Sequence, residues 1–110
     1  MNRLERLGLE VAAFQLLGSR TQAATLCALL EAEGRTVSPD HLAAARPWMQ
    51  HELTDTANVI KTRVCVLRES MSDVGLAGLI VTAGGREKGG YALPEPGRSV
   101  VMARLIEVAA

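Results

Sequence analysis

The residues best suited to chemistry lie between positions 55 and 71, in the stretch DTANVIKTRVCVLRESM. Amide, hydroxyl and cationic side chains recur there at intervals that place them on the exposed surface of a helix, since each residue turns a helix by about 100°. They are Asn58, Lys61, Thr62, Arg63 and Arg68. Asn and Thr can read base edges in a DNA groove, whereas Lys and Arg mostly bind phosphates. An ordinary solvated helix face has the same pattern, and this alternative stays open.

The same stretch has the apolar pattern of a helix that packs on a core. Its apolar residues are spaced four, three and four apart, at Ile60, Val64, Leu67 and Met71. This spacing puts them on one side of a helix over residues 55–71. Thr54 or Asp55 can cap the first turn, and residues 72–75 end the helix. Lys61 and Arg68 lie outside the apolar stripe, so their replacement is expected to leave the fold intact.

A β-hairpin is expected next, because two short runs, residues 79–82 and 91–93, flank the glycine-rich segment 83–90. Arg86 and Lys88 fall at its tip, where they can reach a phosphate or a neighbouring minor groove. The glycines could also form a phosphate cradle. No Lys-Ser or Lys-Thr pair follows them and no helix begins there, so a flexible loop is the favoured interpretation.

The remaining polar residues do not predict catalysis, and we expect no enzyme, no cofactor and no metal. His41, His51 and Glu52 lack the spacing of metal ligands. Acidic residues occur in the chain, but nothing converges on them as in an active-site pocket. Cys65, expected on an exposed helix face, has either a redox role or an incidental one.

Helices are expected at both ends of the chain, over residues 2–17 and 99–110. The first has an apolar stripe spaced three, four and three apart, made of Leu4, Leu7, Val11 and Phe14. Such a stripe either covers the core of its own domain or meets a second copy of the chain. The last helix is largely apolar. We expect the two helices to form a dimer surface, to which Val101 and Leu105 contribute.

Two further helices are expected in the first half of the chain. Ser19 followed by Gln22 is typical of a capping box, and the helix that it opens should end near Gly34. Ser38 and Pro39 then open a short helix over residues 39–45. Residues 46–54 are expected to be a connection.

Length and composition limit the possible functions. The 110 residues are enough for one domain, and the formal net charge is zero, which differs from the basic character of many nucleic-acid binders. Residues 58–110 nevertheless hold seven Lys and Arg against five Asp and Glu. No membrane span or signal peptide is apparent, and we expect free thiols at both cysteines, so the protein should be cytoplasmic.

Three blocks of the sequence are characteristic in combination. Residues 34–38 read Gly-Arg-Thr-Val-Ser, residues 58–71 include the pair Leu67-Arg68, and the hairpin has Ile-x-Thr at 80–82 and Gly-Tyr-x-Leu at 90–93. Together they resemble the DNA-binding domain of OmpR/PhoB-type response regulators. The resemblance covers residues 19–93 and implies a winged helix-turn-helix: mainly α with a small β-hairpin, an α+β fold. Here the single domain, residues 1–110, has an extra N-terminal helix within 1–18 and an extra C-terminal helix within 94–110.

The chain also departs from that family. Residues 1–17 look helical where the family has a small sheet, and we expect no receiver domain within the 110 residues. The positions of Cys65 and Val66 are commonly Arg in the family. DNA binding would therefore depend on the helix residues named above, together with Arg86 and Lys88.

Two functions remain open. The first is a small bacterial or phage transcription regulator that binds double-stranded DNA as a homodimer on two half-sites, with helix 55–71 in the major groove and wing 79–93 on the adjacent backbone or minor groove. The second is a protein-interaction module that docks on RNA polymerase or another regulator. Only for the first must the binding affinity fall steeply as the salt concentration rises.

Overall fold

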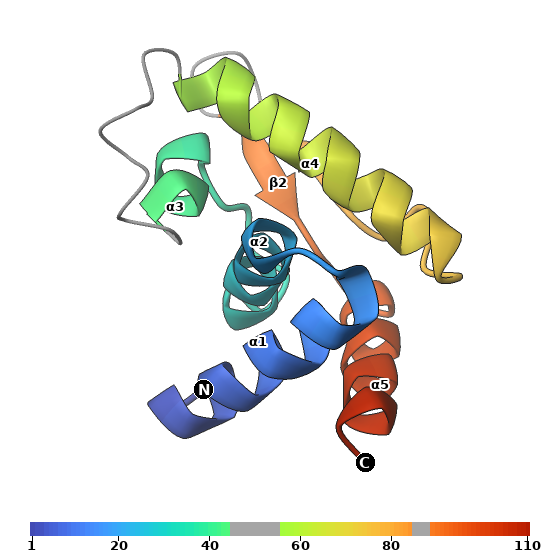
Figure 1. Cartoon of the computed structure of the whole chain (residues 1–110). Helices are drawn as coiled ribbons and strands as arrows, with labels where there is room; N and C mark the ends of the chain where they lie inside the picture. Colours follow the sequence, from blue (N-terminus) through green and yellow to red (C-terminus); the bar gives the residue numbers. More distant parts are fainter. Residues whose placement is uncertain (45–55, 85–88) are drawn as a thin grey trace.

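The computed structural model describes residues 1–44, 56–84 and 89–110. This part of the chain is mainly helical and has one small antiparallel sheet of two strands (Figure 1). In chain order, the elements are α1 (Arg3–Leu17), α2 (Arg20–Glu31), α3 (Pro39–Ala44), α4 (Thr56–Asp73), β1 (Val81–Ala83), β2 (Gly90–Ala92) and α5 (Gly97–Ala109). The expected mixture of helices with one hairpin is confirmed.

Side-chain caps fix where several helices begin. The side chain of Ser19 accepts a hydrogen bond from the Gln22 amide at 3.3 Å, and that of Ser38 accepts one from the His41 amide at 3.1 Å. Both predicted caps are therefore confirmed, and each satisfies an amide that has no partner within its helix. The predicted caps Thr54 and Asp55, and the predicted connection 46–54, lie outside the described residues.

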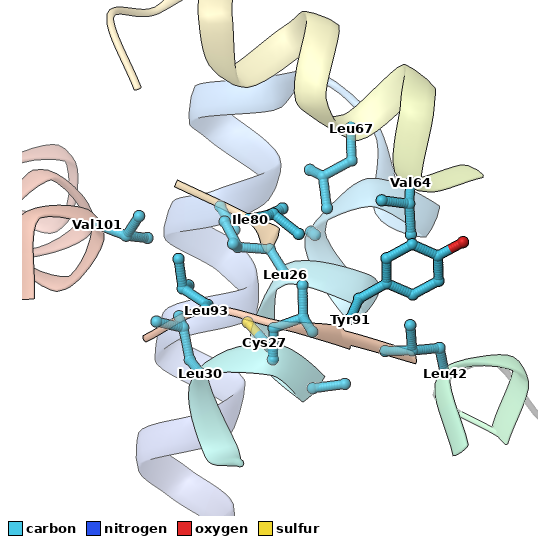
Figure 2. Packing of buried hydrophobic residues seen from close by; sticks show 14 of the residues in the cluster. Leu26, Cys27, Leu30, Leu42, Val64, Leu67, Ile80, Tyr91, Leu93 and Val101 are labelled. Atoms are coloured by element: carbon cyan, nitrogen blue, oxygen red, sulfur yellow. The ribbon is translucent and has the colours of Figure 1, made fainter. Parts of the chain in front are cut away.

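Helix α2 lies at the centre of the fold, and every residue from 23 to 30 is buried. Helices α1 and α4 both pack on α2, which lies between them in Figure 1. The four apolar residues predicted to face the core from α4 are buried, as expected: Ile60, Val64, Leu67 and Met71. Figure 2 shows Val64 and Leu67 among side chains from α2, α3 and the hairpin.

The apolar stripe of α1 faces outward, so the interpretation in which it covers its own core is wrong. Leu4 leaves 80% of its surface exposed, and Leu7, Val11 and Phe14 are exposed as well. Small residues on the opposite side, including Ala12 and Ala13, are buried instead. The small size of these alanines lets the backbone of α1 approach that of α2 closely. The larger side chains of the stripe face solvent.

The expected dimer surface also needs correction at Val101 and Leu105. Both are fully buried members of the core cluster, because α5 packs against α1 and turns this side inward. An apolar pair four residues apart shows that one side of a helix is buried, but it does not show what covers that side.

The hairpin is tied to the segment that precedes α3. Strands β1 and β2 pair antiparallel, with Thr82 opposite Tyr91, and they start at residues 81 and 90 rather than at 79 and 91. Tyr91 also forms a β-bridge with Val37, through backbone hydrogen bonds of 2.7 and 2.9 Å. Gly90 is required there, because a Cβ at this position would meet the Val37 carbonyl and lie 2.9 Å from Thr36 Cγ2.

Candidate nucleic-acid interface

The outward face of α4 is polar along a helix of 18 residues, which spans about 27 Å. Asn58, Lys61 and Thr62 are exposed on it, and so are Cys65 and Glu69. The Thr62 hydroxyl donates to the Asn58 carbonyl at 3.1 Å, and Asn58 takes part in a further interaction within the chain. The structure thus brings together the predicted amide, hydroxyl and ammonium groups on one surface.

Arg63 lies on the flank of α4 next to the start of α2. It borders a depression of about 150 Å³, whose other lining residues are Ser19, Thr21, Gln22, Thr25, Thr62 and Val66. The N-terminus of a helix carries a partial positive charge, so the field of α2 adds to that of the guanidinium there. Sequence reasoning identified the cap of α2 but did not predict that it lies beside Arg63.

The capping box at the start of α2 is only half formed. Ser19 caps the Gln22 amide, but Gln22 Oε1 is buried and has no hydrogen-bond partner among the described residues. The expected return bond from the Gln22 side chain to the Ser19 amide is therefore not made through this oxygen. Gln22 itself lines the depression that Arg63 borders.

Arg68 is engaged within the fold rather than displayed on the surface. Its Nη2 donates to the Ile80 carbonyl at 3.1 Å and to Thr82 Oγ1 at 3.0 Å. Its guanidinium carbon also lies 5.7 Å from the centre of the Tyr91 ring, within the range of a cation–π contact. We call this set of contacts the Arg68 clamp, because it holds α4 against the hairpin.

Among the described residues, neither Lys61 nor Arg63 has an ion-pair partner. These two cations on α4 are therefore available to a ligand, although Glu69 adds a negative charge to the same exposed face. Arg86 and Lys88, predicted at the tip of the hairpin, lie outside the described residues.

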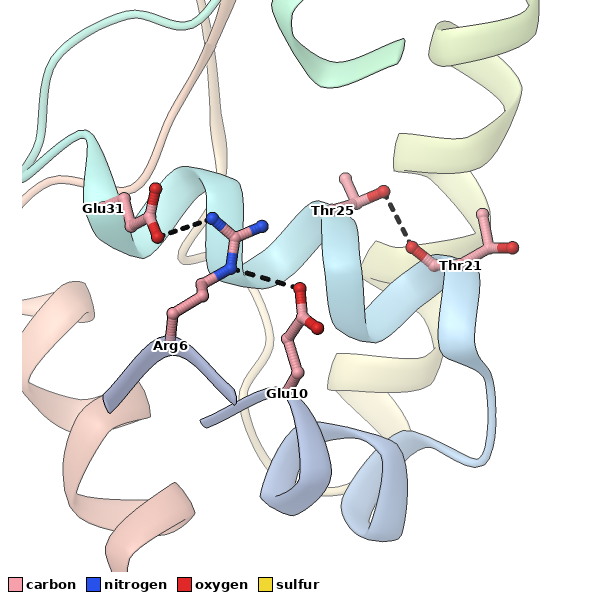
Figure 3. A network of polar contacts seen from close by, with 5 residues as sticks. All are labelled: Arg6, Glu10, Thr21, Thr25 and Glu31. Atoms are coloured by element: carbon pink, nitrogen blue, oxygen red, sulfur yellow. Dashed lines mark hydrogen bonds and ion pairs between the residues drawn. The ribbon is translucent and has the colours of Figure 1, made fainter. Parts of the chain in front are cut away.

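A second polar cluster joins α1 to α2 and lies apart from this face (Figure 3). Arg6 pairs with Glu10 at 3.1 Å and with Glu31. Beside it, burial raises the pKa of the Cys27 thiol to about 12, although the positive charge of Arg6 acts in the opposite direction. A thiol with this pKa stays protonated and unreactive near neutral pH, so the cluster joins the two helices rather than forming a reactive site.

No group of three His, Cys, Asp or Glu side chains within the described ranges could hold a metal ion. Among the described helices, none combines the length and apolar character that crossing a membrane requires. Comparison of the chain with protein-family models, with curated proteins and with solved structures finds no match.

Proposed function

We propose that the chain is a winged helix-turn-helix DNA-binding regulator, in which α4 enters the major groove and the hairpin is the wing. The observation that carries the proposal is the position of Lys61, Arg63 and the Arg68 clamp along one helix. The clamp fixes the hairpin beside a helix on which Lys61, exposed, and Arg63, half-buried on the flank, have no ion-pair partner among the described residues. A helix of this size fits the major groove of B-DNA.

The bridge between Val37 and Tyr91 supports the same proposal. It anchors the hairpin to the segment between α2 and α3. The hairpin is therefore held on one side by this bridge and on the other by the Arg68 clamp to α4. Phosphate contacts fix the register and orientation of a protein on DNA. Lys61 and Arg63 would then position the unit, while Asn58 and Thr62 would read base edges.

Salt dependence of binding to random duplex DNA tests the proposal. The logarithm of affinity falls with the logarithm of salt concentration by about 0.9 per phosphate contact. Lys61 and Arg63 alone therefore predict a slope of about −2, and further contacts make it steeper. Lys61→Gln and Arg63→Gln should each reduce the slope by about 1.

The matched control is Arg3→Gln, which removes one exposed positive charge from α1. Its slope should equal that of the unmodified chain. Equal slopes in all three variants would remove α4 from the proposed DNA interface.

A protein-docking function is the second candidate, and the outward face of α4 also favours it. Val66 is exposed there beside Cys65, and Glu69 opposes phosphate binding. Such a face could dock on RNA polymerase or on another regulator. Absence of DNA binding at both about 50 and about 200 mM salt would support this candidate over the first.

A further inference from the structure

Helix α1 is apolar on two opposite sides. Leu9, Ala12 and Leu16 pack inward against the core cluster. The outward stripe described above lies about 180° from them around the helix axis, at 100° per residue. A surface helix that packs on its own domain needs only one apolar face. Within the described part of the chain, no segment covers this outward face of α1.

The outward stripe has a symmetry that suits a second copy of itself. Its intervals of three, four and three residues are the same in both chain directions. When two α1 helices run antiparallel about a two-fold axis near residue 9, Leu4 of one copy faces Phe14 of the other. Leu7 then faces Val11, and each contact occurs twice, as an isologous interface requires.

Among residues 1–44, 56–84 and 89–110, no charged side chain lines the groove beside this stripe. Its volume is about 460 Å³, and it is lined by Leu4, Leu7, Gly8, Val11, Gln15 and Ala109, together with Ala12. A helix that lies on a membrane surface typically has a polar face rich in Lys and Arg, whereas the two cations of α1, Arg3 and Arg6, are balanced by Glu5 and Glu10. Since the chain has no net charge, two copies do not repel each other strongly.

The exposed apolar area is close to what a weak dimer needs. Ile106 on α5 leaves 62% of its surface exposed, and it lies on the same flank of α5 as Ala109, which lines the groove. With the α1 stripe, this patch measures on the order of 500 Å², near the upper end of the range found on monomers. A standard interface buries roughly 800 Å² per partner, which Met1, Gly8 and Gln15 can help to supply.

The outward faces of α1 and α4 point in opposite directions. Arg6 of α1 pairs with Glu31 on one side of α2 (Figure 3), whereas Gln22 of α2 lies beside Thr62 and Arg63 of α4. Gln22 and Glu31 are nine residues apart, which is about 180° around the helix axis. Two copies joined through α1 would thus carry their α4 helices on opposite ends of the assembly.

From these observations we infer that the outward face of α1, extended by Ile106 and Ala109 of α5, is a two-fold interface with a second copy of this chain. Resting on the proposed DNA-binding function, the inference adds that the dimer holds two separate duplex segments, one at each end. This replaces the sequence-based expectation of two half-sites on one duplex, which needs both recognition helices on the same side.

The interface itself is tested without DNA, by sedimentation equilibrium of the full chain over a range of concentrations. The unmodified chain should pass from monomer to dimer. Leu7→Glu places a charge in the apolar contact and should raise the dimer dissociation constant about tenfold or more. The matched control is Val100→Glu, on the other flank of α5, where the side chain is also exposed; it should dimerise normally.

A chain that stays monomeric up to several hundred micromolar overturns the inference. Flotation of that monomer with vesicles of anionic lipid would assign the face to a membrane surface instead. Equal dissociation constants for Leu7→Glu and the unmodified chain would also overturn it.

Cross-linking tests the antiparallel geometry. In a Cys65→Ser background, the double variant Leu4→Cys with Phe14→Cys should form a disulfide-linked dimer under mild oxidation, whereas Leu4→Cys alone should not. Cross-linking of the single variant would show parallel helices and contradict the proposed axis.

Bridging is measured last, as co-capture of a labelled duplex on a second, immobilised duplex. The unmodified chain should capture it, and Leu7→Glu should bind single duplexes without capture. If the unmodified chain and Leu7→Glu both bind single duplexes but neither captures the labelled duplex, only the bridging of two duplexes is overturned. A chain that dimerises but binds no DNA overturns the proposed function and leaves the interface standing.

Discussion

Replacing Arg68 by Met should loosen α4 from the hairpin while keeping the apolar bulk of the side chain. The variant loses the bonds to the Ile80 carbonyl and to Thr82 Oγ1, together with the contact on the Tyr91 ring. A hydrogen bond from a charged donor contributes about 1.5–3 kcal/mol, and an exposed cation–π contact about 0.5–1 kcal/mol. Because the site is partly exposed and such terms are not additive, we expect a loss of about 2–3 kcal/mol in the free energy of unfolding.

Urea denaturation followed by helical circular dichroism measures this loss, and Lys61→Met is its control. Lys61 is exposed and has no ion-pair partner among the described residues, so the control should change stability by no more than about 0.5 kcal/mol. Arg68→Lys keeps the charge but not the fork of donors, and should fall between the two. Equal stability of Arg68→Met and Lys61→Met would refute the clamp and restore the sequence-based expectation that both residues are replaceable.

Three further substitutions test the fold around the site. Gly90→Ala should destabilise the hairpin, because the added Cβ clashes with the Val37 carbonyl and Thr36 Cγ2. Gly8→Ala adds a Cβ that meets nothing within 4 Å among the described residues and should stabilise α1 by about 0.5–1 kcal/mol. Thermal melts compare the two variants. Leu105→Ala should cost about 2–5 kcal/mol as a core residue, and Ile106→Ala much less, in denaturation of dilute monomer. Burial raises the pKa of Cys27 from 9.0 to about 12 in the folded chain. The stability that the protonated thiol contributes should therefore be complete below about pH 9 and fall by about 1.4 kcal/mol per pH unit between pH 9 and 12. The difference in free energy of unfolding between the unmodified chain and Cys27→Ala, measured across this range, tests the expectation.

Local rules predicted the elements well because each rests on neighbouring residues. A Ser side chain can cap a helix only from the position before its first turn, so Ser19 and Ser38 marked the starts of α2 and α3. The stripe of α4 has its polar residues on the other side, so the direction of burial followed from the spacing alone.

The terminal helices were harder to predict, because their apolar patterns do not show which element each apolar side packs against. The stripe from Leu4 to Phe14 has large side chains, and the residues that actually pack inward include two alanines, which score weakly as core residues. Val101 and Leu105 follow an equally apolar pattern, yet they are buried. Which side of each helix is covered depends on how α1, α2 and α5 meet, and this is a property of the tertiary structure.

Arg68 shows the same limit at the candidate interface. From sequence it counts with Lys61 as a cation on one flank of α4, with Arg63 on the other flank. In the fold, carbonyl and hydroxyl oxygens from a segment 12 to 14 residues away take up its donors. Its effect on a ligand is then indirect, because it sets the position of the hairpin. Under the proposed DNA-binding function, each copy would then make fewer phosphate contacts than the sequence suggests, and Lys61 and Arg63 would carry more of the salt dependence.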